Sequence, residues 1–350
     1  MTGTSTADRT GVTATAAARS GGASRVPVVV LVVLLVAAVL ASIAFGSKAT
    51  GLGDVLQVLT GRGDAVADRG IIEARVARTA VGFVVGAALA VAGAAMQGLT
   101  RNPLADPGLL GVNAGAALAV VVAIAVFGVG SLTGYVWWAM GGAGLAAVLV
   151  HALAALAGRG MTPLRLTLAG AAVTAGLASW SSGLLVSSKQ SFDSFRFWQV
   201  GTIGGRGIDL VSTVLPFLVV GLVVVLLTVR QLNALALGDD LARGLGENVV
   251  LARAAVAVGV AVLCGTATAL AGPIGFLGLV VPHVARLVVG PDHRRIVPVC
   301  LVAGPTLLLL ADTVGRLVAP PGEVQAGIMT AVIGVPFFVL LVRRGRMASL

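Results

Sequence analysis

Few side chains in this sequence have the type and spacing that catalysis or metal binding requires. The three histidines, His151, His283 and His293, lie too far apart in the sequence to suggest a metal cluster. The two cysteines, Cys264 and Cys300, lack metal-ligand spacing and are typical of buried thiols that pack as small hydrophobic side chains. The Gly-x-x-x-x-Gly-Lys-Ser/Thr pattern that binds nucleotide phosphates is absent as well. We therefore expect neither an enzyme nor a metal site, and no bound cofactor.

Asp312 is an acidic residue well inside a long apolar segment, "LLLLADTVGRL". An ionisable group at that depth in a membrane is a candidate for function by default. Arg316 follows four residues later on the same helix face, so an ion pair at a helix end explains the spacing equally well. The scarcity of other carboxylates in the apolar segments argues against a carrier driven by a proton or sodium gradient.

The segment 272–287, "GPIGFLGLVVPHVARL", is an apolar run interrupted by polar residues. Pro282 removes a backbone donor, His283 adds an ionisable ring, and Arg286 adds a fixed charge one turn later. By itself, the interruption fits either a spoiled helix end or a functional break, and the resemblance given below favours a broken helix within a moving bundle. Alternatively, His283 caps or hydrogen-bonds the broken helix and has no further role.

A polar stretch at 233–253, "NALALGDDLARGLGENVVLAR", connects two apolar segments. Glycines divide it into short helical pieces, and Leu237, Leu241 and Leu245 recur every fourth residue. Such a stripe can lie against the protein's own helices, or it can dock a partner.

The composition identifies the class of protein. The 350 residues are 57% hydrophobic and 11% charged, with a mean hydropathy of +1.02, and a soluble domain could not cover so apolar a chain with polar groups. The sequence therefore predicts an all-α, polytopic membrane protein. The net charge of +10 reflects the collection of arginine in cytosolic loops and not a nucleic-acid partner.

The apolar runs predict about ten transmembrane helices that form one helical bundle. Residues 1–26, rich in Thr, Ala, Ser and Gly, predict a disordered cytosolic tail. An even number of spans also returns the C-terminus to the cytosol. The expected spans are 27–45, 79–97, 111–129, 136–157, 166–187, 210–229, 250–271, 275–289, 296–315 and 325–342.

Two segments echo each other. Residues 86–112 and 261–287 each run from an Ala/Gly-rich helix into a proline-interrupted segment. With the first helix pointing inward and the second outward, they have the relation of an inverted repeat in a transporter.

Several motifs, in order, resemble the FecCD-type permeases, the membrane subunits of ABC importers for iron-siderophores, haem and cobalamin. "ALGDDLARGLG" (236–246) resembles the family's cytosolic A-L-G-x-x-x-A-x-x-L-G motif. The others are "GAALAVAGAAMQGLTRNPLADPGLLGVNAGA" (86–116), "FRFWQVGTIGGR" (195–206), "GPIGFLGLVVPHVARLVVGPDHR" (272–294), "LLLADTVGR" (308–316) and "IGVPFFVLL" (333–341). The resemblance covers residues 27–345.

The resemblance implies the type II ABC importer fold in a bacterial cytoplasmic membrane. It further implies a second permease subunit, either a copy of this chain or a paralogue, with the pathway at the two-fold axis. Two cytosolic ATPase subunits would bind the loop at about 233–250 and hydrolyse the ATP, and an extracytoplasmic binding protein would deliver the substrate. The residues that match the ATPase-coupling loop are Leu237, Gly238, Asp239, Leu241, Ala242, Leu245 and Gly246.

Docking of the binding protein, by the same resemblance, falls to Arg75, Arg78 and Arg316. The chain departs from the family twice near these residues. Ala77 replaces the proline of an R-x-P-R motif, and Gln325 replaces the proline of E-L-P-x-G. The sequence therefore does not determine the direction of the arginine side chains or the residue at which the last span begins.

The resemblance also assigns pathway and structural residues. The outer pathway is expected at Ser187, Ser188, Gln190 and Trp198, and the inner gate at Thr162, Pro163 and Leu164. The motif residues expected to shape the bundle are Gln97, Asn102, Pro103, Asp106, Pro107, Pro282, His283, Arg286 and Asp312.

The cargo is not readable from the sequence. An iron-siderophore complex is the leading expectation, and haem or cobalamin on the same fold is the alternative. An ion-coupled secondary transporter is the competing class. Transport of substrate down an ion gradient without any ATPase subunit would exclude the importer. Deletion of 237–246 should uncouple transport while leaving membrane insertion intact, and unchanged uptake would exclude the coupling loop.

Overall fold

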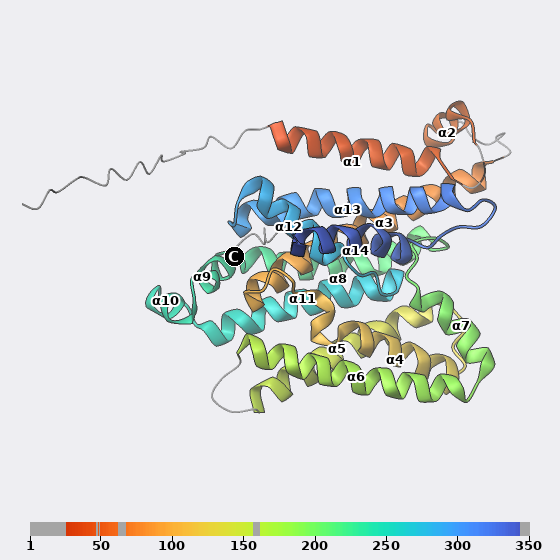
Figure 1. The fold of residues 1–350 in the computed structure, drawn as a ribbon. Coiled ribbons are helices and arrows are strands. Elements are labelled where there is room, and N and C mark those ends of the chain that lie inside the picture. The colour runs from red at the N-terminus through yellow and green to blue at the C-terminus, as the bar shows by residue number, and fades with distance from the viewer. Residues whose placement is uncertain (1–25, 47, 49, 62–67, 157–161, 344–350) are drawn as a thin grey trace, which may run out of the picture.

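The structure is a computed structural model that describes residues 26–46, 48, 50–61, 68–156 and 162–343. Throughout these ranges the regular elements are all helices (Figure 1), which confirms the predicted fold class. The tail expected at 1–26 lies outside the described residues except for Val26, where α1 begins.

Within the part of the chain that the structure describes, six helices are long and apolar enough to cross a membrane. They are α3 (Arg69–Thr100), α5 (Leu132–Leu156), α6 (Pro163–Val186), α8 (Ile208–Leu227), α11 (Val249–Ala271) and α13 (His293–Val318). Shorter apolar stretches lie in α1 (Val26–Ala44), α4 (Val112–Ala125), α12 (Leu277–Val289) and α14 (Ala326–Arg343). Each predicted span falls on one of these helices.

The predicted boundary that differs most is the start of α3. Hydropathy places it near residue 79, but the helix begins at Arg69. The first turns contain arginines and Glu73, which an apolar window excludes, although charged residues of this kind form helix well. Arg69 and Glu73 also form an ion pair across one turn, at 2.7 Å.

Several short helices were not predicted as separate elements, because they are too short or too polar to resemble a span. They are α2 (Leu52–Leu59), the 3₁₀ helix η1 (Pro107–Leu110) and α7 (Lys189–Gln199). Two other short helices, α9 (Val229–Ala236) and α10 (Asp239–Gly244), lie at the polar stretch 233–253, where short helical pieces were predicted.

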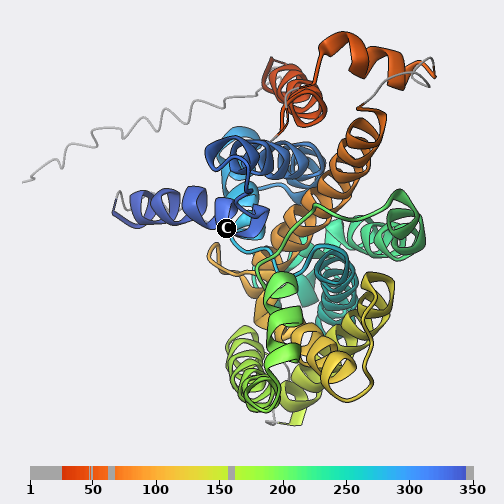
Figure 2. The same cartoon turned by 90° about the vertical axis from the view of Figure 1, so that its right-hand side faces the viewer.

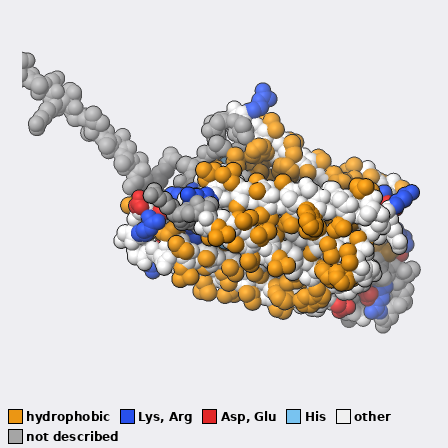
Figure 3. All heavy atoms as spheres, turned by 90° about the horizontal axis from the view of Figure 1, so that it is seen from below, with side chains coloured by type: hydrophobic (Ala, Val, Ile, Leu, Met, Phe, Trp, Pro, Cys, Tyr) orange, Lys and Arg blue, Asp and Glu red, His pale blue; other side chains and the backbone are white. Residues whose placement is uncertain are grey.

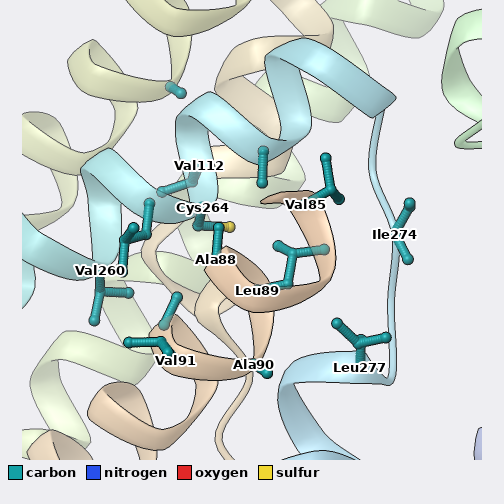
Figure 4. Close-up of a cluster of buried hydrophobic side chains, with 14 of the residues drawn as sticks. Val85, Ala88, Leu89, Ala90, Val91, Val112, Val260, Cys264, Ile274 and Leu277 are labelled. Atoms are coloured by element: carbon teal, nitrogen blue, oxygen red, sulfur yellow. The ribbon is translucent and has the colours of Figure 1, made fainter. Parts of the chain in front are cut away.

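Helix α3 is the centre of the bundle. It packs against α13, α11, α12 and α8, and Figure 2 shows it crossing the molecule obliquely between them. A second group, α4, α5 and α6, packs beside α11. Figure 4 shows Ala88 and Leu89 of α3 between Cys264 of α11 and Leu277 of α12, all of them buried.

The outer surface is apolar along the middle of the bundle. Figure 3 shows hydrophobic side chains over the face formed by α4 to α6, while charged side chains gather mainly at the two ends. This distribution fits a protein surrounded by lipid.

The two ends of the bundle carry different short helices (Figure 1). We call the end with α9 and α10 the α10 end, and the end with α2 and α7 the α7 end. Helix α3 finishes at the α10 end, where Arg101 pairs with Asp239 at 3.3 Å. Helix α11 finishes at the α7 end, where the Ala271 carbonyl accepts a hydrogen bond from Thr202 at 2.7 Å. The two echoing segments therefore run in opposite directions, as an inverted repeat requires.

Candidate functional site

The α10 end presents a row of exposed leucines. Leu237, Leu241 and Leu245 are 59%, 61% and 60% exposed. Gly238 and Gly246 flank the helix with φ of +107° and +82°, values that L side chains rarely adopt. The glycines thus let the chain turn sharply on both sides of α10 and hold the leucines outward.

Ala242 lies on the opposite side of α10 from these leucines. It is fully buried and packs with Leu235, Val249 and Ala252. The prediction that Ala242 belongs to the ATPase contact surface is therefore wrong, because a side chain without exposed area cannot touch a partner. Ala242 supports α10 from inside.

Asp239, the first residue of α10, ties this helix to two long ones. Its Oδ1 accepts a hydrogen bond from Nη2 of Arg253 in α11 at 2.8 Å, and Arg101 at the end of α3 lies 3.3 Å away. The negative charge at a helix N-terminus also suits the helix dipole. One carboxylate therefore links α10 to both α3 and α11.

A second connection runs from α9 to the corner between α12 and α13. Asn233 donates Nδ2 to Oδ1 of Asp292 at 2.6 Å and accepts from the backbone amide of His293 at 3.0 Å. Burial acts to raise the pKa of Asp292, but hydrogen bonds from the Arg294 amide and Asn233, with the charges of Arg294 and Arg295, outweigh it. The pKa of Asp292 is therefore held below its ordinary value.

Gln97 bridges the two motif segments. Its Nε2 donates to the carbonyl oxygens of Gly278 and Leu279, each at 3.3 Å, and its Oε1 accepts from Nη2 of Arg286. In a regular helix the Gly278 carbonyl would accept from residue 282, which is proline and has no N–H. Gln97 thus supplies the donor that Pro282 removes.

Arg286 and His283 are buried beside this bridge, at 4% and 1% exposure. Among the described residues, Nε and Nη1 of Arg286 and both ring nitrogens of His283 have no hydrogen-bond partner. The His283 ring instead faces Phe337 edge-on, with centroids 6.1 Å apart. His283 therefore makes none of the hydrogen bonds that the capping alternative requires.

The first motif segment shapes the turn after α3. The side chain of Asn102 accepts from the Leu104 amide at 2.9 Å, and the side chain of Asp106 accepts from the Gly108 amide at 2.8 Å. Pro103 lies within this turn and Pro107 opens η1. These are side-chain turns of the kind that end a helix and restart it in a new direction.

At the α7 end, Asp312 is the centre of an ion-pair network. It is fully buried and accepts a bidentate pair of hydrogen bonds from Arg78, at 2.8 and 2.9 Å. Arg316 lies 3.1 Å from its other side. The predicted Asp312–Arg316 pair is present, but the stronger partner, Arg78, comes from α3. The third guanidinium nitrogen of Arg78 donates to Glu323 at 2.7 Å.

Arg316 and Arg75 cap the end of α1. Arg316 donates to the carbonyl oxygen of Ser42 at 3.0 Å, and Arg75 donates to those of Ile43 and Ala44 at 3.2 and 2.9 Å. The last carbonyls of a helix have no partner within it, and cations satisfy them favourably. The structure thus brings all three arginines together, with their guanidinium groups engaged by internal partners.

A hollow of about 330 Å³ opens beside these arginines. It has both basic and acidic groups at its rim, including Glu323. Its lining residues include Gly46, Lys48, Arg75, Arg78, Arg316 and Glu323.

The two departures from the family pattern have a local explanation. Ala77 lies inside the continuous helix α3, where proline would remove a hydrogen bond. Gln325 precedes α14, and its carbonyl accepts from the Ile328 and Met329 amides. The last helix therefore begins without proline.

The expected gate and pathway residues lie at opposite ends of α6. Thr162 caps the N-terminus, where its hydroxyl accepts from the Arg165 amide at 3.4 Å. Pro163 follows at the first helical position, and Leu164 is 69% exposed. At the other end, Ser187 ends α6, and Ser188 caps α7 by accepting from the Ser191 amide at 3.2 Å.

Of the remaining pathway candidates, one lies at a surface hollow and one does not. Gln190 lines an open hollow of about 620 Å³ along α7. Trp198 is only 3% exposed, and its ring lies 5.8 Å from that of Phe195. Trp198 is therefore corrected from a pathway position to a packing position.

A further hollow of about 470 Å³ between α4, α6 and α7 was not predicted. Its lining carries small hydroxyl and amide groups and no charged side chain. Single serines within apolar helices give no sequence signal, so only the folded arrangement identifies this place. The polar residues that line it are Asn113, Ser181, Ser182 and Gln199.

Comparison with known proteins finds permeases over nearly the whole chain. The ferric enterobactin transport system permease protein FepD of Escherichia coli (strain K12) is 43% identical over 90% of this chain and 94% of its own length. The probable siderophore transport system permease protein YfiZ of Bacillus subtilis (strain 168) is 41% identical over 91% of this chain and 95% of its own length.

The fold has a match among solved structures. The inward-facing conformation of a putative metal-chelate type ABC transporter superposes with a TM-score of 0.78 at 28% identity, covering 90% of this chain and 97% of that one. The FecCD transport family matches residues 34–344. This protein is a multi-pass membrane protein that belongs to the FecCD transport family.

Proposed function

We propose that this chain is the permease subunit of an ABC importer in a bacterial cytoplasmic membrane, and that its cargo is a ferric siderophore. The observation that carries the proposal is the leucine row on α10, held outward by glycines and anchored through Asp239 to α3 and α11. The cargo class rests on the relatives, two of which are named for ferric enterobactin and siderophore transport.

Each permease of a pair docks one ATPase subunit at its α10 end, so that the pair binds two ATPase subunits. Closure of the ATPases on ATP pushes on Leu237, Leu241 and Leu245. Asp239 passes this force to α3 and α11, while Asn233 passes it to the α12–α13 corner. Rigid helices then switch between outward- and inward-facing arrangements.

The α7 end receives an external binding protein. Arg75, Arg78 and Arg316 all line the hollow. Arg75 and Arg316 also hold α1 in place, and Arg78 shares its charge with Glu323. A carboxylate of the binding protein would exchange with Glu323, which is itself 37% exposed along its side chain. If this exchange occurs, Arg78→Glu should weaken the affinity of the permease for the binding protein, whereas Lys189→Glu on α7 should leave that affinity unchanged.

A pathway with hydroxyl and amide groups but few charges suits a bulky chelate. Such a lining offers weak hydrogen bonds everywhere and no site strong enough to trap the cargo. The hollow at Ser181 and Ser182 is part of this pathway.

Cobalamin is the second candidate cargo, because a cobalamin import permease of Halobacterium salinarum is 41% identical over 77% of this chain. An ion-coupled carrier is disfavoured, since Asp312 is neutralised by two arginines and is not free to bind a proton or sodium.

Uptake into proteoliposomes tests the proposal. Vesicles holding this chain, its ATPase and its binding protein should take up a ⁵⁵Fe-labelled siderophore only with ATP inside, and should take up neither cyanocobalamin nor haemin. Uptake driven by an ion gradient without the ATPase would overturn the importer proposal. Uptake of cyanocobalamin alone would overturn only the cargo.

A further inference from the structure

An apolar groove of about 410 Å³ lies between α1, α12 and α13. Its walls are aliphatic side chains such as Val28, Leu31, Val288 and Ala303. Several of them are open to the outside; Val28 is 52% and Val288 is 51% exposed. The groove is therefore accessible from the lipid phase.

The groove belongs to the α10 end. It includes the third residue of α1, the last residue of α12 and the seventh residue of α13. The α12–α13 corner beside it is hydrogen-bonded to α9 through Asn233. The groove thus opens where the helices meet the membrane surface.

A cation stands at the mouth of the groove by helical register. Arg295 precedes the lining residues Val299 and Ala303 by one and two turns, on the same face of α13. Side chains on a helix lean toward its N-terminus, which carries this guanidinium outward to headgroup level. Eight residues of helix span about 12 Å, close to the hydrocarbon depth of one leaflet, about 15 Å.

Arg295 is available for a ligand. It is exposed, and within the described residues it forms no ion pair. The nearby carboxylate of Asp292 accepts instead from Asn233 and from the Arg294 amide. Arg294 precedes Pro298, which does not line the groove, so the two arginines face different directions.

We propose that this groove binds one anionic phospholipid, with an acyl chain between α1 and α12–α13 and the phosphate on Arg295. The site is independent of the cargo. A bound lipid would tie α1, which packs on α13 and is hydrogen-bonded at its far end by Arg75 and Arg316, to the corner that α9 contacts.

Native mass spectrometry of the full chain released from mixed phosphatidylglycerol and phosphatidylcholine vesicles tests the site. The wild type should retain phosphatidylglycerol preferentially. Arg295→Gln should lower the bound ratio about five-fold, the share of one basic side chain near an anionic surface. Arg294→Gln is the matched control and should leave the ratio unchanged.

A second variant tests the tail. Ala303→Leu fills the groove and should lower retention of phosphatidylglycerol, whereas Val314→Leu, on a lipid-facing position of the same helix, should not. Equal effects of the two arginine variants, or undiminished retention by Ala303→Leu, would overturn the proposal. So would disulfide cross-linking of two copies through Val288→Cys, because a second chain would then fill the groove.

Discussion

Gln97 donates its side-chain amide to the carbonyl of Gly278, at 3.3 Å, across 181 residues of sequence. That carbonyl lacks a helical donor because residue 282 is proline. The proline-interrupted segment is therefore a broken helix whose missing hydrogen bond comes from the central helix, α3.

This relationship predicts a coupling between Gln97 and Pro282. Gln97→Leu should lower the free energy of unfolding by about 1–3 kcal/mol, since it leaves a buried carbonyl and Arg286 without partners. Pro282→Ala provides an N–H for the same carbonyl, so the loss should be smaller in that background. Thermal unfolding in detergent measures the cycle, and an identical loss in both backgrounds would contradict it.

A second prediction concerns the buried carboxylate at the α7 end. Asp312→Asn should destabilise the protein by about 3–5 kcal/mol, because Arg78 and Arg316 would stay buried without a counter-charge. Glu323→Gln, at the exposed side of the same arginine, should lose less than about 1 kcal/mol. Chemical unfolding of the two variants compares them, and similar losses would refute the central position of Asp312.

Substitution of the two neighbouring aspartates of α10 should affect cargo uptake differently. Asp239→Asn weakens the anchor to Arg253 and Arg101, so we expect ATP hydrolysis to continue while uptake falls several-fold. Among the described residues, Asp240 pairs with the exposed Arg243 alone, at 2.9 Å, and Asp240→Asn should behave as wild type. The ratio of transported cargo to hydrolysed ATP is the measurement. Parallel loss in both variants would remove the anchoring role.

Close contact between α3 and α12 depends on glycine. A Cβ at Gly93 would lie 2.0 Å from the Gly278 carbonyl oxygen, so Gly93→Ala should separate the helices and lower Tm. Gly141→Ala meets nothing within 4 Å and should stabilise α5 by about 0.5–1 kcal/mol. An unchanged or higher Tm for Gly93→Ala would show that packing at Gly93 is not limiting.

The α12–α13 corner should be sensitive to acid. The pKa of Asp292 is lower in the folded protein than its ordinary value, which is about 3.9, so folding favours the ionised form. The resulting stabilisation is present above that ordinary value and is lost as the pH falls through the folded pKa. Unfolding between about pH 5 and 2 should show this loss in wild type, and Asp292→Asn should show a shallower dependence. Parallel curves would exclude Asp292 as its source.

Much of the secondary structure was predictable because its causes are local. A span needs about 20 apolar residues and satisfies its own hydrogen bonds, so hydropathy alone finds it. The same window fails at α3, where Arg69 to Arg78 continue the helix beyond the apolar run. It also misses α2 and α7, whose polar residues do not distinguish a helix from a loop.

Local patterns identified some site residues, namely Asp312 within its apolar segment and the leucines that recur every fourth residue at α10. Most others were predictable only where a motif identified them. The motif resemblance selected Gln97, Arg78 and Asp312, but it did not indicate that Arg78 is the main partner of Asp312. It also misplaced Ala242 and Trp198, because a motif records residue identity and not which side of a helix is covered. Exposure depends on neighbours that are distant in sequence.

By itself, the sequence determined that the chain is a helical membrane protein, where its spans lie and which family it resembles. These follow from apolar length and from ordered motifs, both of which are properties of neighbouring residues. Only the tertiary structure decided which groups meet: Arg78 with Asp312 across 234 residues, and Gln97 with Gly278 across 181. The physical reason is that a buried charge or carbonyl must find a partner wherever the packed helices place one, and packing brings together residues that no local pattern connects.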